Sequence, residues 1–203
     1  MFKNIIENTI NNNFNVRDEY KHLSVDDLKQ IQSETTLPLR VCAVNIEGDL
    51  NVGMMARTAA LIGVEKFYIF GRRRFDRRSL VGAQNYLPIE RVDGLDESGN
   101  IDHDKFLKFC DQEQLIPILF EHGGTLLGKL SWNTLFNDAK KVNKTLCLVF
   151  GNESSGFPEN FRSVHTTVSI YQTGVLRSFN VSAAAAIAMW DCSKSLLESP
   201  LDK

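Results

Sequence analysis

Three short segments of this 203-residue chain combine polar side chains with glycine and alanine in otherwise apolar surroundings. The first, NVGMMARTAALIG at 51–63, contains a single charged residue, Arg57. An arginine on a helix of small residues needs either a partner or solvent. Arg57 could close the helix end in an ion pair, or it could clamp an anion, because its planar fork of donors suits phosphate. Asn51 and Gly53 would stand at the helix N-terminus, which also favours anions.

The second segment, FGNESSG at 150–156, follows an apolar run, and no charged residue lies between Lys144 and Glu153. In open α/β sheets, ligands gather at the carboxyl ends of the strands. Gly151 and Glu153 would stand at such an end, which makes them candidates for a binding site. The pattern also fits a plain glycine turn that exposes its glutamate.

The third segment, 168–190, starts as a β-branched run and ends as a helix with four successive alanines. No charged residue lies between Arg177 and Asp191. Because a surface helix normally carries charge on one face, this helix is predicted to be buried on most sides. Three polar residues stand where it would start: Ser178, Asn180 and Ser182. An N-cap explains one of them, as in any packing helix with a capped start, but not three beside an arginine.

The composition is that of an ordinary globular domain, with 43% hydrophobic residues, 24% charged residues and a net charge of −2. A chain of this length can form one domain with a full core. The charge balance argues against a wholly basic nucleic-acid-binding protein but allows a local basic patch. Residues 72–78 hold five arginines in seven positions. They form either such a patch or a solvated loop.

The four cysteines form no CxxC pair, and the four histidines have no metal-ligand spacing. No apolar run approaches the ~20 residues of a membrane-spanning helix. The first residues lack the charge and apolar pattern of a signal peptide. We therefore expect a cytoplasmic protein with reduced core cysteines, no metal and no membrane segment.

Hydrophobic patterning predicts an alternation of strands and helices along the chain. Strands are expected at 41–46, 66–70, 89–92, 115–120, 145–150 and 168–171. Helices are expected at 51–61, 80–85, 102–110, 132–136 and 158–162, and after Asn180. This alternation predicts an α/β fold with a mainly parallel sheet and helices on both faces. Residues 1–37, with a loop at 11–15 and a helix capped at Ser24, form an N-terminal extension that Pro38 closes, and residues 38–203 form the main domain.

The glycine-rich segments contain no GxGxxG dinucleotide fingerprint, no GxxxxGK[ST] phosphate loop and no GxSxG elbow. Taken together and in this order, however, the three segments resemble the motifs of the SpoU/TrmH branch of the SPOUT RNA methyltransferases. The matching residues are Asn51, Gly53, Arg57, Ala59 and Gly63, then Gly151, Asn152, Glu153 and Gly156, then Gly174 and Ser178–Ser182. The resemblance covers about residues 40 to 195. Phe179 stands where the family usually has leucine, and Tyr171 and Gln172 stand where bacterial members often have Pro-Met.

The resemblance implies a C-terminal trefoil knot and a homodimer whose site lies near the dimer interface. The cofactor would be S-adenosylmethionine, bent and held in the knot largely by backbone groups. Matching by motif puts it near five residues: Glu121, Gly151, Ile170, Leu176 and Phe179.

The implied reaction is methyl transfer to a ribose 2′-hydroxyl of RNA. Arg57 would grip the adjacent phosphate and stabilise the developing oxyanion, since arginine is a poor general base. Asn51 would hold Arg57 or the ribose, and Glu153 would orient Arg57 or brace the dimer. Ser178 and Asn180 would fix the knot loop and contact the nucleotide. Six arginines would hold the RNA backbone: Arg72, Arg73, Arg74, Arg77, Arg78 and Arg177.

The substrate expected from Gln172 and Arg177, which are similar to those of eukaryotic tRNA-guanosine members, is tRNA, with a D-loop guanosine as the best guess. Three alternatives remain. The first is an rRNA 2′-O-methyltransferase. The second is a catalytically weak RNA-binding protein of the same fold. The third is a small-molecule α/β enzyme that uses the crevice at the strand ends.

Overall fold

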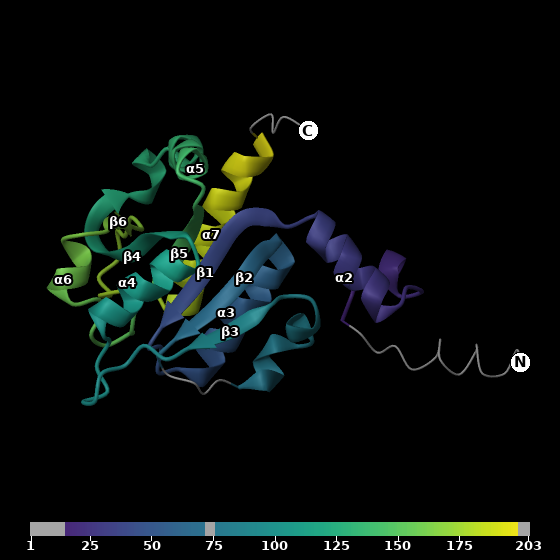
Figure 1. The fold of residues 1–203 in the computed structure, drawn as a ribbon, viewed down its shortest axis with the longest axis horizontal. Helices are drawn as coiled ribbons and strands as arrows, with labels where there is room; N and C mark the ends of the chain where they lie inside the picture. The colour runs from purple at the N-terminus through teal and green to yellow at the C-terminus, as the bar shows by residue number, and fades with distance from the viewer. Residues whose placement is uncertain (1–14, 72–75, 199–203) are drawn as a thin grey trace, which may run out of the picture.

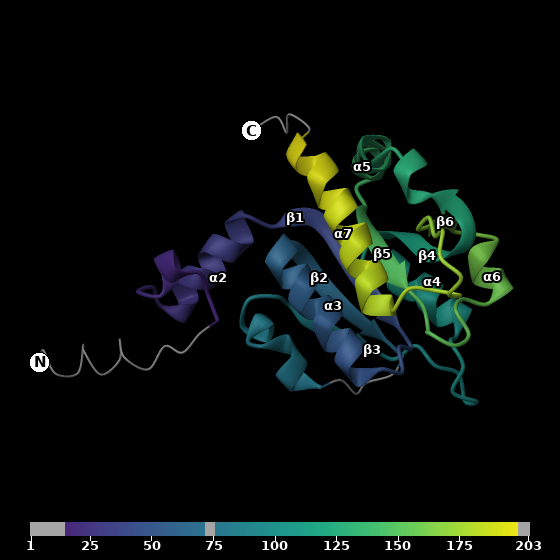
Figure 2. The ribbon, with the colours of Figure 1, turned by 180° about the vertical axis from the view of Figure 1, so that it is seen from behind.

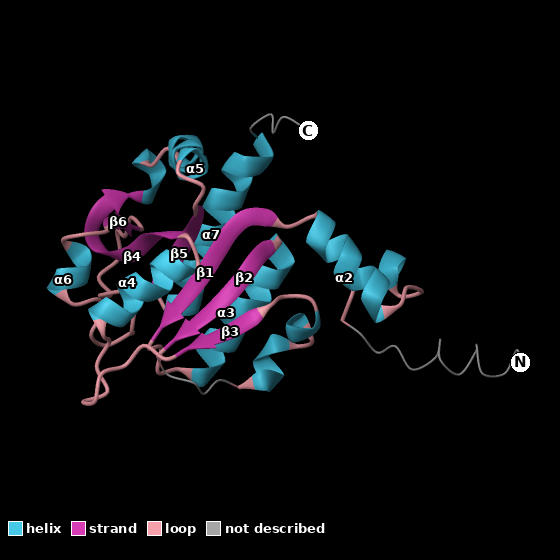
Figure 3. Ribbon diagram, viewed as in Figure 1, coloured by secondary structure: helices cyan, strands magenta, loops and turns pink. Residues whose placement is uncertain are grey.

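The computed structural model describes residues 15–71 and 76–198. Within these residues, six strands form one sheet in the order β3-β2-β1-β5-β4-β6, and every neighbouring pair is parallel. The strands are β1 (Leu37–Val44), β2 (Val64–Phe70), β3 (Ile89–Val92), β4 (Leu115–Leu126), β5 (Thr145–Phe150) and β6 (Thr166–Ser169) (Figure 3). The predicted parallel sheet is confirmed.

Helices cover both faces of this sheet (Figures 1 and 2). One face carries α3 (Asp49–Ile62), α5 (Trp132–Lys141) and α7 (Val181–Glu198), and the other carries α4 (His103–Gln112) and α6 (Glu159–Arg162). Alternate residues of β1 pack into two hydrophobic cores, one on each face of the sheet. Val41 and Ala43 pack in the α3–α7 layer, whereas Cys42 and Val44 pack in the α4 layer. A strand buried on both sides explains why its sequence is continuously apolar.

The N-terminal extension contains a short helix, η1 (Asp18–Tyr20), and α2 (Val25–Glu34), which stands away from the sheet in Figure 1. The predicted cap is present, because the Ser24 hydroxyl accepts from the backbone N of Asp27 and the Asp27 carboxylate accepts from the backbone N of Ser24. Pro38 is the second residue of β1, where the pairing with β2 shifts register. A proline is tolerated there because the ladder is already interrupted. The loop expected at 11–15 lies, except for residue 15, outside the described residues.

Three further elements differ from the prediction. The helix expected at 80–85 is two short 3₁₀ helices, η2 (Arg77–Leu80) and η3 (Ala83–Asn85), because Val81 and Gly82 between them have positive φ. Strand β4 continues beyond residue 120, and η4 (Leu127–Lys129) follows it. Helix α5 extends past the turn expected at 132–136 to Lys141.

Helix α7 is buried on most sides, as its lack of charge predicts, but one stripe along it is exposed. Its outward stripe contains Ile187, 38% exposed, and Trp190, 63% exposed. The neighbouring helix α3 likewise exposes Leu50 and Met54. The two helices lie side by side (Figure 2), and we call the exposed apolar residues Leu50, Met54, Ile187 and Trp190 together the α3–α7 face.

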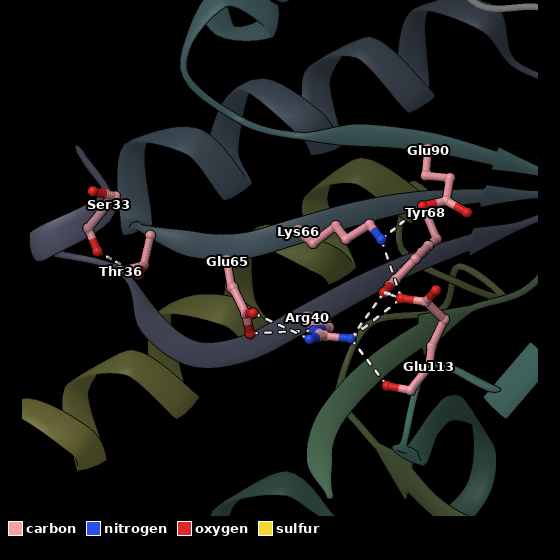
Figure 4. Close-up of polar contacts among 8 residues, drawn as sticks. All are labelled: Ser33, Thr36, Arg40, Glu65, Lys66, Tyr68, Glu90 and Glu113. Carbon is pink, nitrogen blue, oxygen red and sulfur yellow. Dashed lines mark hydrogen bonds and ion pairs between the residues drawn. The ribbon is translucent and has the colours of Figure 1, made fainter. Parts of the chain in front are cut away.

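A polar cluster on the other side of the sheet fastens β1 and β2 to the end of α4 (Figure 4). Arg40 donates to the Glu65 carboxylate at 3.1 Å and to the backbone O of Glu113 at 3.0 Å. The Glu113 carboxylate accepts from the Tyr68 hydroxyl and, at 3.1 Å, from Lys66 Nζ. The Tyr68 hydrogen bond and then the Lys66 ammonium hold the pKa of the Glu113 carboxyl below its ordinary value. Since these groups satisfy one another, we assign the cluster a structural role.

Candidate active site at the carboxyl ends of the strands

A cavity of 320 Å³ opens beside residues 120–122 of β4, where β5 and β6 end and α7 begins. The chain reaches this point by an unusual path: after β6, at the sheet edge beyond β4, residues 170–180 return toward β5 and enter α7. The floor of the cavity is apolar and its rim is polar. Four of the five residues expected to contact the cofactor line it: Glu121, Gly151, Ile170 and Phe179. Leu176 does not line it, because its side chain is 81% exposed on the returning segment.

Glu121 reaches the cavity because β4 bulges after residue 120, as its pairing with β6 shifts register between Phe120 and Thr125. The carboxylate accepts hydrogen bonds from the backbone N of Phe157 at 3.1 Å and of His122 at 2.8 Å. Gly156 makes this approach possible, since a Cβ there would overlap the Glu121 carboxylate, and its φ of +61° disfavours other residues. The glycine that closes the second motif therefore holds Glu121 in position.

Glu153 is fixed by three donors. Its carboxylate accepts from the backbone N of Glu47 at 3.1 Å, the backbone N of Gly48 at 3.3 Å and Asn51 Nδ2 at 2.8 Å. Partial burial raises the pKa of the Glu153 carboxyl, but the hydrogen bonds from Asn51 and from the backbone outweigh it, so the net pKa lies below its ordinary value. Glu153 is therefore an ionised, oriented group.

Asn51 joins the first motif to the third. Its Oδ1 accepts from Asn180 Nδ2 at 3.0 Å, while Asn180 Oδ1 accepts from the backbone N of Ser182 at 2.9 Å and from the Ser182 hydroxyl at 2.6 Å. Asn180 thus caps α7, as N-cap chemistry suggests, and its amide group also holds Asn51. The hydrogen-bonded row Glu153–Asn51–Asn180 brings the three sequence segments together at one end of the cavity.

Asn152 is a site residue to which sequence reasoning assigned no role. It is 6% exposed; its Nδ2 donates to the backbone O of Asn45 at 2.9 Å, and its Oδ1 accepts from the backbone N of Ser154 at 2.8 Å and of Ser155 at 3.0 Å. These bonds shape the turn that presents Glu153. The available signal was an asparagine two residues after a buried strand, a position where side-chain hydrogen bonds replace the ladder.

Arg57 lies away from this cavity. It stands on the exposed side of α3, six residues or about 9 Å along the helix from Asn51. It makes no hydrogen bond or ion pair with any residue that the structure describes. Asn51 and Glu153 were expected to hold Arg57, but neither contacts it. The alternative, in which Arg57 forms a structural ion pair, is not observed either, because no acidic side chain in the described part of the chain pairs with it.

Gly53 serves packing, because a Cβ there would overlap Ser79 of η2. The start of α3 was expected to bind an anion. The anion that it binds in the structure is the Glu153 carboxylate of the same chain, which accepts from the backbone N of Gly48.

Ser178 and Arg177 line the cavity from its exposed rim. Ser178 has no hydrogen-bond partner among the described residues. Two residues that the sequence did not single out also line the cavity: His122 and Arg162, whose guanidinium donates to the backbone O of His122 at 3.1 Å. Their segments carry no motif, so proximity in the fold was the only signal.

The arginine segment is described only in part. Arg72, Arg73 and Arg74 lie outside the described residues. Arg77 is exposed and has no partner in the described ranges, whereas Arg78 pairs with Asp76 at 2.9 Å. Arg77 is therefore the described member of this segment that remains free to contact an anion.

Among residues 15–71 and 76–198, no group of three or more histidine, cysteine or acidic side chains could hold a metal ion. Across the same ranges, no helix has the length and apolarity needed to cross a bilayer. The four cysteines are free and buried.

Comparisons with known proteins bear on what this site does. A sequence profile described as "SpoU rRNA Methylase family" matches residues 38–190. No curated protein sequence matches the chain at a significant level. The solved structure of an A. aeolicus TrmH/SpoU tRNA modifying enzyme is similar, with a TM-score of 0.66 and 20% identity over 86% of this chain and 83% of that one.

Two further structures share the fold. The SpoU methyltransferase AviRb from Streptomyces viridochromogenes, solved with AdoMet, has a TM-score of 0.61 and 18% identity over 81% of this chain and 59% of its own. An AdoMet-bound rRNA methyltransferase from Sinorhizobium meliloti has a TM-score of 0.64 and 19% identity over 84% and 61%. This chain thus spans about three fifths of the length of those two. The likenesses imply the knotted C-terminal fold expected from the motifs.

Proposed function

The chain belongs to the SpoU rRNA methylase family, and on that premise we propose that it transfers a methyl group from S-adenosylmethionine to a ribose 2′-hydroxyl of RNA. The observation that carries this proposal is the hydrogen-bonded row Glu153–Asn51–Asn180, which unites the three motifs at the mouth of the 320 Å³ cavity. If the motifs were only a glycine turn and a capped packing helix, their polar side chains would have no reason to meet beside a cavity.

The cavity suits the cofactor chemically. Its apolar floor, which includes Phe150 and Ile170, fits a flat adenine ring. Glu121 and Glu153 place two carboxylates on the lining, which favours a ligand that carries ribose hydroxyls and a cationic sulfonium. We infer that Gly151, Ile170 and Phe179 hold the adenosyl part. The bound cofactor supplies an activated methyl group, so the protein must align the acceptor and stabilise the charge on it.

Glu153 acts as an orienting group in this proposal. A carboxylate that three donors keep ionised is a weak proton acceptor, so Glu153 fixes Asn51 rather than taking the proton of the acceptor hydroxyl. Asn180 holds Asn51 from the other side. Ser178, unpartnered at the exposed rim, is free to contact the incoming nucleotide.

In this proposal, Arg57 serves the reaction from a second copy of the chain. It stands on the same side of α3 as Leu50 and Met54, seven and three residues before it, and therefore borders the α3–α7 face. We infer that two copies pair through this face as a homodimer, which would cover the exposed Trp190 and bring Arg57 of each copy to the cavity of the other. There Arg57 would grip the phosphate beside the target ribose and stabilise the developing oxyanion.

Mixed dimers test this arrangement. Arg57→Ala copies are combined with Ala184→Phe copies, whose added ring fills the cavity from α7. Each parental dimer should be inactive. Random mixing should restore about a quarter of the wild-type rate, because about half of the dimers are mixed and each has one complete site. No recovery, with mixed dimers demonstrated by mass, would show that Arg57 does not act across the interface.

We favour tRNA as the substrate, with rRNA as the alternative, because Gln172 and Arg177 both line the cavity where substrate-dependent residues would stand. Arg77 and Arg177, with Arg72, Arg73, Arg74 and Arg78, would contact phosphates. The four buried cysteines suit a reducing compartment such as the cytoplasm. The deciding experiment is methyl transfer from labelled S-adenosylmethionine to unmodified total RNA, with mapping of the labelled nucleotide. Label on a ribose of tRNA is expected, label on rRNA would identify the alternative, and absence of transfer despite cofactor binding would refute the proposed activity.

A further inference from the structure

A second cavity, of 390 Å³, lies at the end of α3 remote from the first one. Its walls come from the last turns of α3, from the turn Val81–Ala83 and from the N-terminal extension around Tyr20 and α2. We call it the α2–α3 cavity. Much of its wall is apolar: Leu28, Ile31, Leu61, Ile62 and Leu80. No residue lines both cavities.

The charge of the α2–α3 cavity is concentrated in two arginines that line it. Arg17 is engaged, because it pairs with Glu19 at 3.1 Å and lies over the Tyr20 ring at 4.5 Å. Arg57 is exposed and has no partner in the described part of the chain. An apolar slot with two aromatic wall residues, Tyr20 and Tyr86, and one unengaged guanidinium at its side suits a flat base joined to a phosphate.

Two features of this wall are energetically unfavourable. The Tyr86 hydroxyl is buried and has no hydrogen-bond partner within residues 15–71 and 76–198. Val81 has a φ of +48°, a left-handed conformation that is an outlier for a β-branched residue. Costs of this kind persist mainly where a segment binds something, so they single out the wall as a functional surface.

We propose that the α2–α3 cavity holds the base of an RNA nucleotide that flanks the methylated one, with the phosphate between the two nucleotides on Arg57. This inference rests on the proposed function, in which Arg57 grips the phosphate beside the target ribose. A phosphodiester joins two nucleosides. One of them would lie at the partner copy's cofactor cavity, and the α2–α3 cavity is the hollow beside Arg57 in its own copy. The N-terminal extension would then contribute directly to substrate choice.

The test uses the full-length protein and a substitution that fills the cavity. Ala60→Leu adds bulk from α3 into the α2–α3 cavity, and Thr35→Trp narrows it from the exposed rim. Gln84→Leu is the matched control, because it adds an apolar group on η3 at an exposed residue that does not line the cavity. The probes are the four nucleoside 5′-monophosphates and inorganic phosphate, titrated by NMR.

At least one monophosphate should bind more tightly than inorganic phosphate. Ala60→Leu and Thr35→Trp should weaken that binding by about tenfold or more, whereas Gln84→Leu should leave it unchanged. Tyr86→Phe should alter the preference among the four bases. Affinity for S-adenosylmethionine should stay the same in all four variants. Thr35→Trp decides the matter if Ala60→Leu melts well below the wild type.

Inorganic phosphate binding as tightly as every monophosphate would overturn the inference, and so would unchanged nucleotide binding in both filled variants. Methyl transfer to RNA separates this result from the proposed function. A wild-type protein that methylates RNA, with filled variants that match its kcat/KM, refutes the cavity alone. A protein that binds nucleotides in the α2–α3 cavity but methylates no RNA refutes the proposed function alone.

Discussion

Replacing Gly156 by alanine tests whether the second motif holds Glu121 for the cofactor. The new Cβ would overlap the Glu121 carboxylate and would also sit on a backbone with φ of +61°. The left-handed backbone costs about 1–2 kcal/mol, which in a domain of this size lowers Tm by roughly 2–8 °C. Displacing Glu121 disturbs its hydrogen bonds to the backbone N of His122 and Phe157. A displaced Glu121 would also lose its proposed contact with the cofactor, and losing one charge-assisted hydrogen bond to a ligand costs about 1.5–3 kcal/mol, or roughly tenfold to a hundredfold in affinity.

Gly99→Ala provides the control, because Gly99 has φ of +82° but open space around its Cβ position. Both variants should melt lower than the wild type, and only Gly156→Ala should lose affinity for S-adenosylmethionine by calorimetry. Equal cofactor affinity in the two variants would refute the role assigned to Gly156 and Glu121. A Gly99→Ala protein that also binds the cofactor weakly would show that general strain, rather than the carboxylate, governs binding.

Three further outcomes are expected. Arg57→Ala should keep the wild-type Tm and cofactor affinity while single-turnover methyl transfer falls by about a hundredfold or more, and Arg57→Lys should recover little because lysine lacks the planar fork; a near wild-type rate would remove Arg57 from the mechanism. Trp190→Glu should convert the dimer to monomer in sedimentation, whereas Leu107→Glu, an exposed leucine on the α4 side, should not; dimers in both would place the interface elsewhere. The hydrogen bond from Tyr68 lowers the pKa of the Glu113 carboxyl, so the ionised carboxylate stabilises the fold above pH 4.5, its ordinary pKa, and this stabilisation is lost as the pH falls through the lower pKa of the folded protein. Glu113→Gln should therefore lose less stability than the wild type below about pH 4.5 in denaturant melts. An equal loss of stability in both proteins would contradict this assignment.

The exposed apolar residues of α3 and α7 bear on the role proposed for Arg57. In one copy, Arg57 borders an uncovered surface and reaches nothing among the described residues, while the three motifs meet at a cavity without it. The dimer that we propose would explain both features: Arg57 would reach the cavity of the other copy, and the apolar face beside it would be covered. Both features would otherwise be unexplained costs.

The sequence determined the elements and the motifs. Strand β5 has the predicted bounds because its apolar run ends at Gly151, and β3, a short segment with an apolar residue at each end, also has the predicted bounds. The caps at Ser24 and Asp102 were equally readable, since a side chain that satisfies a free helix N–H acts within three residues. These signals depend on neighbours in the chain, so one sequence suffices to find them.

Only the tertiary structure decided which motif residues touch. Asn51 bonds Glu153, 102 positions away, and Asn180, 129 positions away, because the parallel sheet and the returning segment 170–180 bring three strand and helix ends together. The same topology leaves Arg57 outside the cavity. The bulge that aims Glu121 and the exposed stripe of α7 were also invisible, since both arise from what packs on the other side of an element. Local sequence specifies how a segment pairs its own backbone hydrogen-bonding groups. Contacts between residues more than a hundred positions apart form only once the order of the strands in the sheet is fixed.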